Sequence, residues 1–133
     1  MFDHINALVL PVLDVKSCAF FYRDKLGLNL EQLENDEAYL TFSAKGATVL
    51  ALKSINLVAR EISKERIKPE ENEGVKRTHL VVFVDDVDKE YNELMQKGVH
   101  FVNAPTTKEG GWRTAHFEDP ERNLWEISQR PKK

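Results

Sequence analysis

The sequence predicts an α+β fold in which two βαβββ modules form one curved mixed sheet around a concave cavity, with the helices outside. The main observation is an internal repeat: VLDV at residues 12–15 returns as VDDV at residues 84–87, an offset of 72 residues. In both copies an apolar run precedes these residues and an amphipathic helical pattern follows them. A charged segment at residues 54–77 separates the copies. One module cannot bury a sheet face alone, so we expect the two to join around a cavity of the kind that binds ligands.

Residues 1–53 form the first expected module. The apolar run NALVLPVLD predicts a strand that ends at Asp14, whose carboxylate suits the N-cap of a helix in DVKSCAFFYRDKLGL. Gly27 suits the end of that helix. Apolar residues then alternate along AYLTFSAKGATVLALKS, which predicts a hairpin with its turn at Lys45-Gly46.

Residues 54–77 are dense in Arg, Lys and Glu, which indicates a solvated linker with one short helix in LVAREISKER. Residues 78–130 form the second expected module. Its first strand, THLVVFVDD, leads into a helix that begins after Asp86 and stops at Gly98. A strand in VHFVNAP, a loop in TKEGG and a closing hairpin in WRTAHFEDPERNLWEIS complete it.

Composition and charge narrow the class of protein. The 133 residues suffice for a single domain (1–133) of paired modules, and 41% hydrophobic with 31% charged residues is typical of a globular chain. A net charge of −3 gives no reason to expect a nucleic-acid partner. Cys18 is the single cysteine, so no intramolecular disulfide is possible. The N-terminal apolar stretch is too short to span a membrane and lacks a preceding basic region, so we expect no signal peptide, no membrane partner and a cytoplasmic location.

The last predicted strand carries an unexpected charge. Side chains alternate between the faces of a strand, so Trp125 and Ile127 share one face while Leu124, Glu126 and Ser128 share the other. A buried carboxylate is costly unless it is paired or bound to a cation. Glu126 is therefore a candidate functional residue.

Three stretches carry a family resemblance. VLDVKSCAFFYRDKLGL, HLVVFVDDVDKEYNELMQKGV and FEDPERNLWEI resemble the vicinal oxygen chelate superfamily. This superfamily includes glyoxalase I, fosfomycin-resistance thiol transferases, extradiol dioxygenases and bleomycin-resistance proteins. The resemblance covers nearly the whole chain except residues 54–77. It implies the fold strongly, but the fold hosts several chemistries.

The resemblance also implies where metal ligands would lie. In metal-using members they come from the first and last strand of each module. His79, seven residues before Asp86, and Glu126 match those ligands in type and place, whereas the places in the first module hold Ala7 and Ala51. Two protein ligands retain a divalent ion poorly, since catalytic sites usually keep three and an open position.

A third ligand is available in the second module. His116 lies on the strand next to the one that carries Glu126, at a place that tends to face the cavity in the family. With His79 it would complete a two-His-one-carboxylate set that suits Zn, Mn, Ni or Fe ions. The alternative is a hydrogen-bonded pair of His79 and Glu126 that needs no metal. For Trp112 and Thr114, which share parity with His116, we expect positions in the cavity wall, beside Ala7, Val9 and Ala51.

Three functions fit these residues. The first is a metal-free binder of a small organic molecule, similar to bleomycin-resistance proteins. The second is a divalent-metal-dependent lyase, thiol transferase or dioxygenase that uses His79 and Glu126 as ligands, with or without His116, and Glu126 as the catalytic group that moves a proton. The third is a degenerate structural or regulatory module. The resemblance further implies a homodimer, and alanine at two ligand places predicts no robust glyoxalase I activity.

Overall fold

The structure is a computed structural model that describes residues 5–42, 48–65, 67–68 and 79–132. The chain divides into two compact units, Met1–Gly74 and Val75–Lys133. The predicted turn at Lys45-Gly46 lies outside the described residues. No helix in the described part of the chain is long and apolar enough to cross a membrane.

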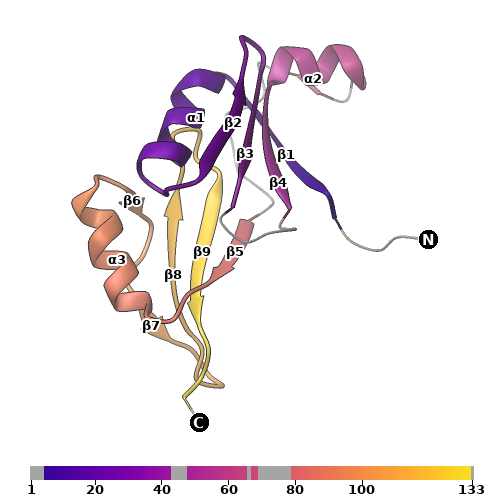
Figure 1. Cartoon of the computed structure of the whole chain (residues 1–133). Coiled ribbons are helices and arrows are strands. Elements are labelled where there is room, and N and C mark those ends of the chain that lie inside the picture. The colour runs from indigo at the N-terminus through magenta and orange to yellow at the C-terminus, as the bar shows by residue number, and fades with distance from the viewer. Residues whose placement is uncertain (1–4, 43–47, 66, 69–78, 133) are drawn as a thin grey trace. The chain divides into compact units, whose positions relative to one another are not determined.

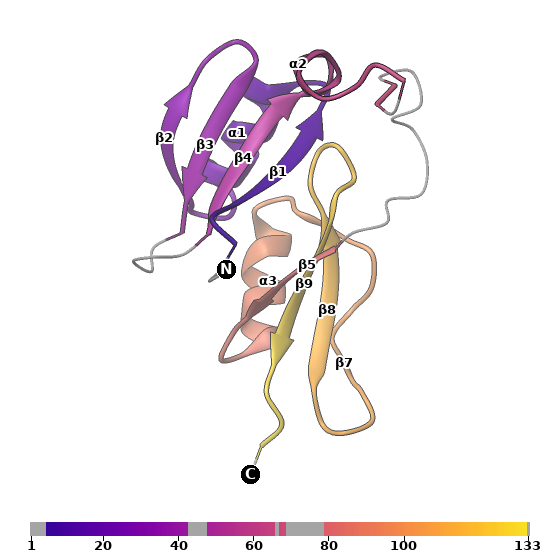
Figure 2. The ribbon, with the colours of Figure 1, turned by 90° about the vertical axis from the view of Figure 1, so that its right-hand side faces the viewer.

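The first unit is a four-stranded mixed sheet with two helices (Figure 1). Its elements are β1 (Ala7–Val12), α1 (Val15–Asp24), β2 (Asn29–Leu33), β3 (Glu37–Thr41), β4 (Val49–Ser54) and α2 (Ile55–Glu61). The strand order is β1-β4-β3-β2, with β1 parallel to β4. Figure 2 shows α1 behind this sheet. Cys18 and Tyr22 of this helix have no exposed surface. The helix α2 starts at Ile55, slightly before the helix predicted in LVAREISKER.

The second unit repeats this plan in a five-stranded mixed sheet. Its elements are β5 (His79–Phe83), α3 (Val87–Gln96), β6 (His100–Phe101), β7 (Thr106–Thr107), β8 (Arg113–Glu118) and β9 (Leu124–Gln129). The strand order is β5-β9-β8-β6, and β7 pairs with β8. The predicted strand in VHFVNAP is reduced to the two residues of β6. The α+β class with repeated modules is confirmed.

The predicted helix ends are confirmed in both units. The Asp14 carboxylate accepts a hydrogen bond from the Ser17 amide at 3.0 Å, and Asp86 accepts one from Lys89 at 3.1 Å. A glycine with positive φ follows α1 and α3, Gly27 at 76° and Gly98 at 85°. An L-residue adopts this conformation only at a cost, which is why glycine stands there.

Strand register shows the repeat at the level of residue pairs. In the first unit β1 pairs with β4 in parallel, which places Val9 beside Ala51. In the second unit β5 pairs with β9 in parallel, which places Val81 beside Glu126. Val81 and Glu126 in the second unit therefore occupy the positions that Val9 and Ala51 occupy in the first unit.

One face of the five-stranded sheet is packed against α3 (Figure 1). Trp125, Ile127 and Phe117 are at most 4% exposed on this side. Aromatic contacts fix the helix there, since the Tyr91 ring of α3 lies 4.6 Å from the Phe101 ring, which lies 5.4 Å from Phe117. We call the opposite side the distal face. Alternation and register assign to it His79, Val81, Phe83, Thr114, His116, Glu118, Leu124, Glu126 and Ser128.

Candidate functional site

Three adjacent strands of the second unit bring His79, His116 and Glu126 together on the distal face. Glu126 lies on the middle strand, β9, and is the register partner of His116 on β8. On its other side the register partner is Val81 of β5, so His79 approaches Glu126 diagonally from two residues earlier in β5. We call these three residues the His-His-Glu cluster. All of it belongs to one unit of the chain.

The cluster is compact and partly shielded from solvent. His116 Nε2 lies 2.9 Å from Glu126 Oε1, and His79 Nε2 lies 3.6 Å from the same oxygen. One potential ligand atom from each residue falls within 4.8 Å of the others. The side chains of His116 and Glu126 are each 18% exposed, whereas His79 is 48% exposed and forms the open side of the cluster.

The arrangement fits a divalent metal ion. Nitrogen and oxygen ligands bind zinc at about 2.1 Å, so two ligands of one ion lie roughly 3–4 Å apart. The separations of 2.9 and 3.6 Å match that spacing, and both imidazoles present a nitrogen to the carboxylate. Within the described ranges this is the one group of three metal-binding side chains at such spacing. Three protein ligands leave coordination positions for other molecules.

The same atoms also fit a direct hydrogen bond between His116 and Glu126 at 2.9 Å. Asn103, which is outside the cluster, contacts His116 on the side of the ring away from Glu126. Its Oδ1 accepts a hydrogen bond from the His116 backbone amide at 2.9 Å, and its Nδ2 lies 3.1 Å from His116 Nδ1. The sequence interpretation missed Asn103. Its signal was an amide side chain at the end of a predicted strand, where asparagine is disfavoured.

An apolar surface adjoins the cluster on the distal face. Val81 and Phe83 are 47% and 55% exposed, and the Phe83 and Trp112 rings lie 5.2 Å apart. We call Val81, Phe83 and Trp112 the apolar patch. Trp112 was among the expected wall residues, but Val81 and Phe83 were not. Their parity with His79 in β5 was the available signal.

The remaining predicted residues divide between the units. Thr114 lies on the distal face, two residues from His116, and is 7% exposed. Ala7, Val9 and Ala51 belong to the first unit, where Val9 is 44% exposed and Ala51 is 1% exposed. The cluster and the apolar patch thus form without residues of the first unit.

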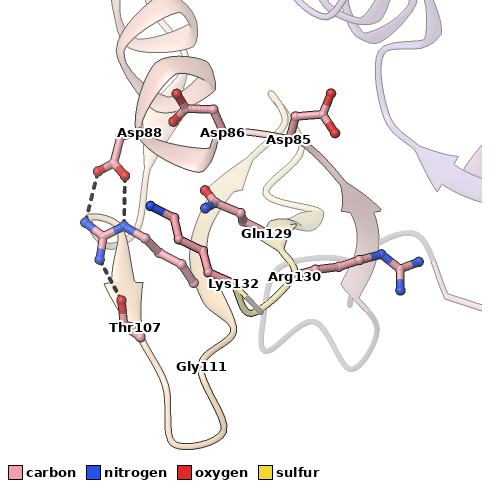
Figure 3. A pocket seen from close by; sticks show the side chains of 9 residues that line it. Asp85, Asp86, Asp88, Thr107, Gly111, Gln129, Arg130 and Lys132 are labelled. Atoms are coloured by element: carbon pink, nitrogen blue, oxygen red, sulfur yellow. Dashed lines mark hydrogen bonds and ion pairs between the residues drawn. The ribbon is translucent and has the colours of Figure 1, made fainter.

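A separate pocket of the second unit lies away from the His-His-Glu cluster (Figure 3). It has a volume of about 560 Å³, and its lining contains none of the predicted site residues. Figure 3 shows Asp88 and Thr107 in this lining. The Arg113 guanidinium donates to Asp88 at 2.8 and 2.9 Å and to Thr107 at 2.9 Å. The hydrogen bonds to Arg113 lower the pKa of the Asp88 carboxyl and Asp88 raises that of Arg113. This pair connects α3 to β8.

Comparisons with known proteins agree with the fold and the repeat. The family model described as the Glyoxalase/Bleomycin resistance protein/Dioxygenase superfamily matches residues 2–127. The uncharacterized protein YraH of Bacillus subtilis is 41% identical over 119 residues, which cover 89% of this chain and 91% of YraH. The virulence protein STM3117 of Salmonella typhimurium is 26% identical over 132 residues, covering 96% and 84% of the two chains.

Two solved structures are similar over almost their full length. A glyoxalase/bleomycin resistance protein/dioxygenase from Nocardioides has a TM-score of 0.82 at 24% identity, covering 99% of this chain and 86% of that one. TnmS3, an antibiotic binding protein from Streptomyces sp. CB03234, has a TM-score of 0.68 at 26% identity, covering 97% of both chains.

Proposed function

This chain belongs to the glyoxalase/bleomycin resistance protein/dioxygenase superfamily, and on that premise we propose that it binds a divalent transition-metal ion through His79, His116 and Glu126 and acts on a small organic molecule at that ion. The observation that carries the proposal is the convergence of two imidazole nitrogens on one carboxylate oxygen, at 2.9 and 3.6 Å. The set is complete within one unit, so alanine at positions 7 and 51 does not remove it.

The residues around the cluster suggest how an organic ligand would lie. A bound ion would act as a Lewis acid toward oxygen atoms of the ligand. Val81 is the register neighbour of Glu126, and Phe83 follows about 7 Å further along the strand. The apolar body of the ligand would cover Val81 and the paired rings of Phe83 and Trp112. Glu126, within reach of both imidazoles, is the group placed to hold or move a proton.

A second candidate, metal-free binding of a small molecule, is supported by two observations. The His116–Glu126 hydrogen bond satisfies both groups without an ion. In addition, the similar protein TnmS3 is an antibiotic binding protein. In this case the apolar patch would supply the binding energy, and the cluster would serve as a polar contact for the ligand.

Metal content separates the two candidates. Untagged protein would be incubated with Fe(II), Mn(II), Ni(II) or Zn(II), desalted and measured by inductively coupled plasma mass spectrometry. We expect about one ion per chain in the parent protein. His79→Ala and His116→Ala should each lower the affinity for the ion by at least about 100-fold, because even the mutation of residues that only hydrogen-bond to a ligand lowers metal affinity by about 10–100-fold.

A matched control comes from the same sheet. His100 Nδ1 lies 3.0 Å from Glu118 Oε1, and among the described residues this His–Glu pair belongs to no group of three metal-binding side chains. His100→Ala should therefore leave metal retention unchanged. Retention that is equally low in the parent protein and all three variants would refute the metal site and leave the metal-free binder. Equal loss in His100→Ala would show that the ion binds elsewhere or nonspecifically.

A further inference from the structure

The segment after β6 attaches to β8 beside His116. The Val102 amide donates to the His116 carbonyl at 2.8 Å, and the His116 amide donates to Asn103 Oδ1 at 2.9 Å. The Asn103 side chain thus satisfies the backbone of the residue whose ring it also contacts. A backbone N–H can only donate, so this bond identifies the amide oxygen and assigns the other terminal atom as Nδ2.

The amide offers the His116 ring both a donor and an acceptor. Asn103 Nδ2 lies 3.1 Å from His116 Nδ1, and Oδ1 lies 3.3 Å from it. If Nδ2 donates to Nδ1, the proton of the neutral ring is on Nε2, which donates to Glu126 Oε1 at 2.9 Å. If the proton is on Nδ1 instead, it meets Oδ1, and the lone pair of Nε2 faces the carboxylate.

These two arrangements differ in whether the cluster needs a cation. The first is a continuous chain from Asn103 through His116 to Glu126 in which both ring nitrogens of His116 have a partner. The second places a lone pair against a negative oxygen at 2.9 Å, which is repulsive unless a cation lies between them. A histidine that binds a metal through Nε2 usually donates its Nδ1–H to an acceptor.

We propose that Asn103 is a positioning residue that sets which ring nitrogen of His116 carries the proton. In the free protein its Nδ2 donates to Nδ1 and keeps the proton on Nε2, and when Nε2 serves as a ligand its Oδ1 accepts a hydrogen bond from Nδ1–H. The second half rests on the proposed metal function, whereas the first half does not. An aspartate at position 103 could only accept, so it would hold the proton on Nδ1. An alanine would provide neither contact and would leave the Nδ1 side of the ring to solvent.

The test is a measurement of the tautomer. Long-range ¹H–¹⁵N correlation spectra of ¹⁵N-labelled protein, recorded under mildly alkaline conditions, distinguish protonated from unprotonated ring nitrogens. We expect His116 to carry its proton on Nε2 in the metal-free parent protein and to carry one on Nδ1 in Asn103→Asp. His100, whose Nδ1 contacts Glu118, should give the same spectrum in every variant. Circular dichroism and thermal unfolding would verify that each variant is folded.

Zn(II) binding provides the second measurement. Asn103→Asp should bind Zn(II) about tenfold more tightly than the parent protein and Asn103→Ala about tenfold more weakly. A proton already on Nδ1 in the metal-free parent protein, or a His116 spectrum unchanged by Asn103→Asp, would overturn the proposal. If the spectra change as expected while no variant binds Zn(II), the role of Asn103 in setting the tautomer is supported and the proposed metal function alone fails.

Discussion

Replacing Phe83 by alanine should weaken the binding of a planar apolar molecule to the distal face by about tenfold. Phe83 is 55% exposed, and a Phe side chain has about 200 Å² of surface, so about 110 Å² remains available for contact. At about 25 cal/mol per Å², full coverage would contribute about 2.7 kcal/mol. A ligand covers one side of the ring, so about half of this, or 1.4 kcal/mol, should be lost, which is tenfold in Kd.

Fluorescence titration with 8-anilinonaphthalene-1-sulfonate measures this loss. Energy transfer from tryptophan to the probe reports its binding to the protein, and the difference between the variants assigns that binding to the patch, where the Trp112 ring lies 5.2 Å from Phe83. Val102→Ala is the matched control, since Val102 lies in the same unit, outside the patch, and is 54% exposed. Equal Kd values for the two variants would refute the apolar patch as a binding surface. Phe83→Ala should change the free energy of unfolding by less than about 1 kcal/mol, because exposed side chains contribute little to it.

Two further predictions concern the stability of the second unit. Asp119→Ala should lower the free energy of unfolding by about 2–3 kcal/mol in urea titrations. Asp119 is 4% exposed, and its carboxylate accepts from the amides of Glu121 and Asn123 at 2.9 and 2.8 Å and from the Asn123 side chain at 2.8 Å. A loss below about 0.5 kcal/mol would contradict this role of the carboxylate. Asp88→Asn should remove an acid-sensitive part of the stability, since Arg113 lowers the pKa of Asp88 in the folded state. That contribution is present above the ordinary pKa of an aspartate and is lost as the pH falls through the lowered value. Urea titrations over a pH series should therefore show the parent protein and the variant converging in acid, and a constant difference would contradict the assignment.

Local sequence determined the elements and the repeat. The caps at Asp14 and Asp86 and the stops at Gly27 and Gly98 are properties of a few adjacent residues, so they could be read without tertiary information. Alternation along the last strand likewise separated Glu126 from its buried neighbours, because the period of a strand is two residues. These signals are local, and they reappear unchanged in the structure.

Tertiary structure decided which of these residues meet. The order β5-β9-β8 places Glu126 between His79 and His116, and no local pattern states that order. The contact of Asn103 with His116 depends on a segment that leaves β6 and returns to β8 across 13 residues. The pairing of Phe83 with Trp112 likewise joins β5 to the residue just before β8, a strand that is not the neighbour of β5 in the sheet. Such contacts arise from strand register and chain crossing, which are set by the burial of the whole sheet, so the local signals at these residues do not state which of them meet.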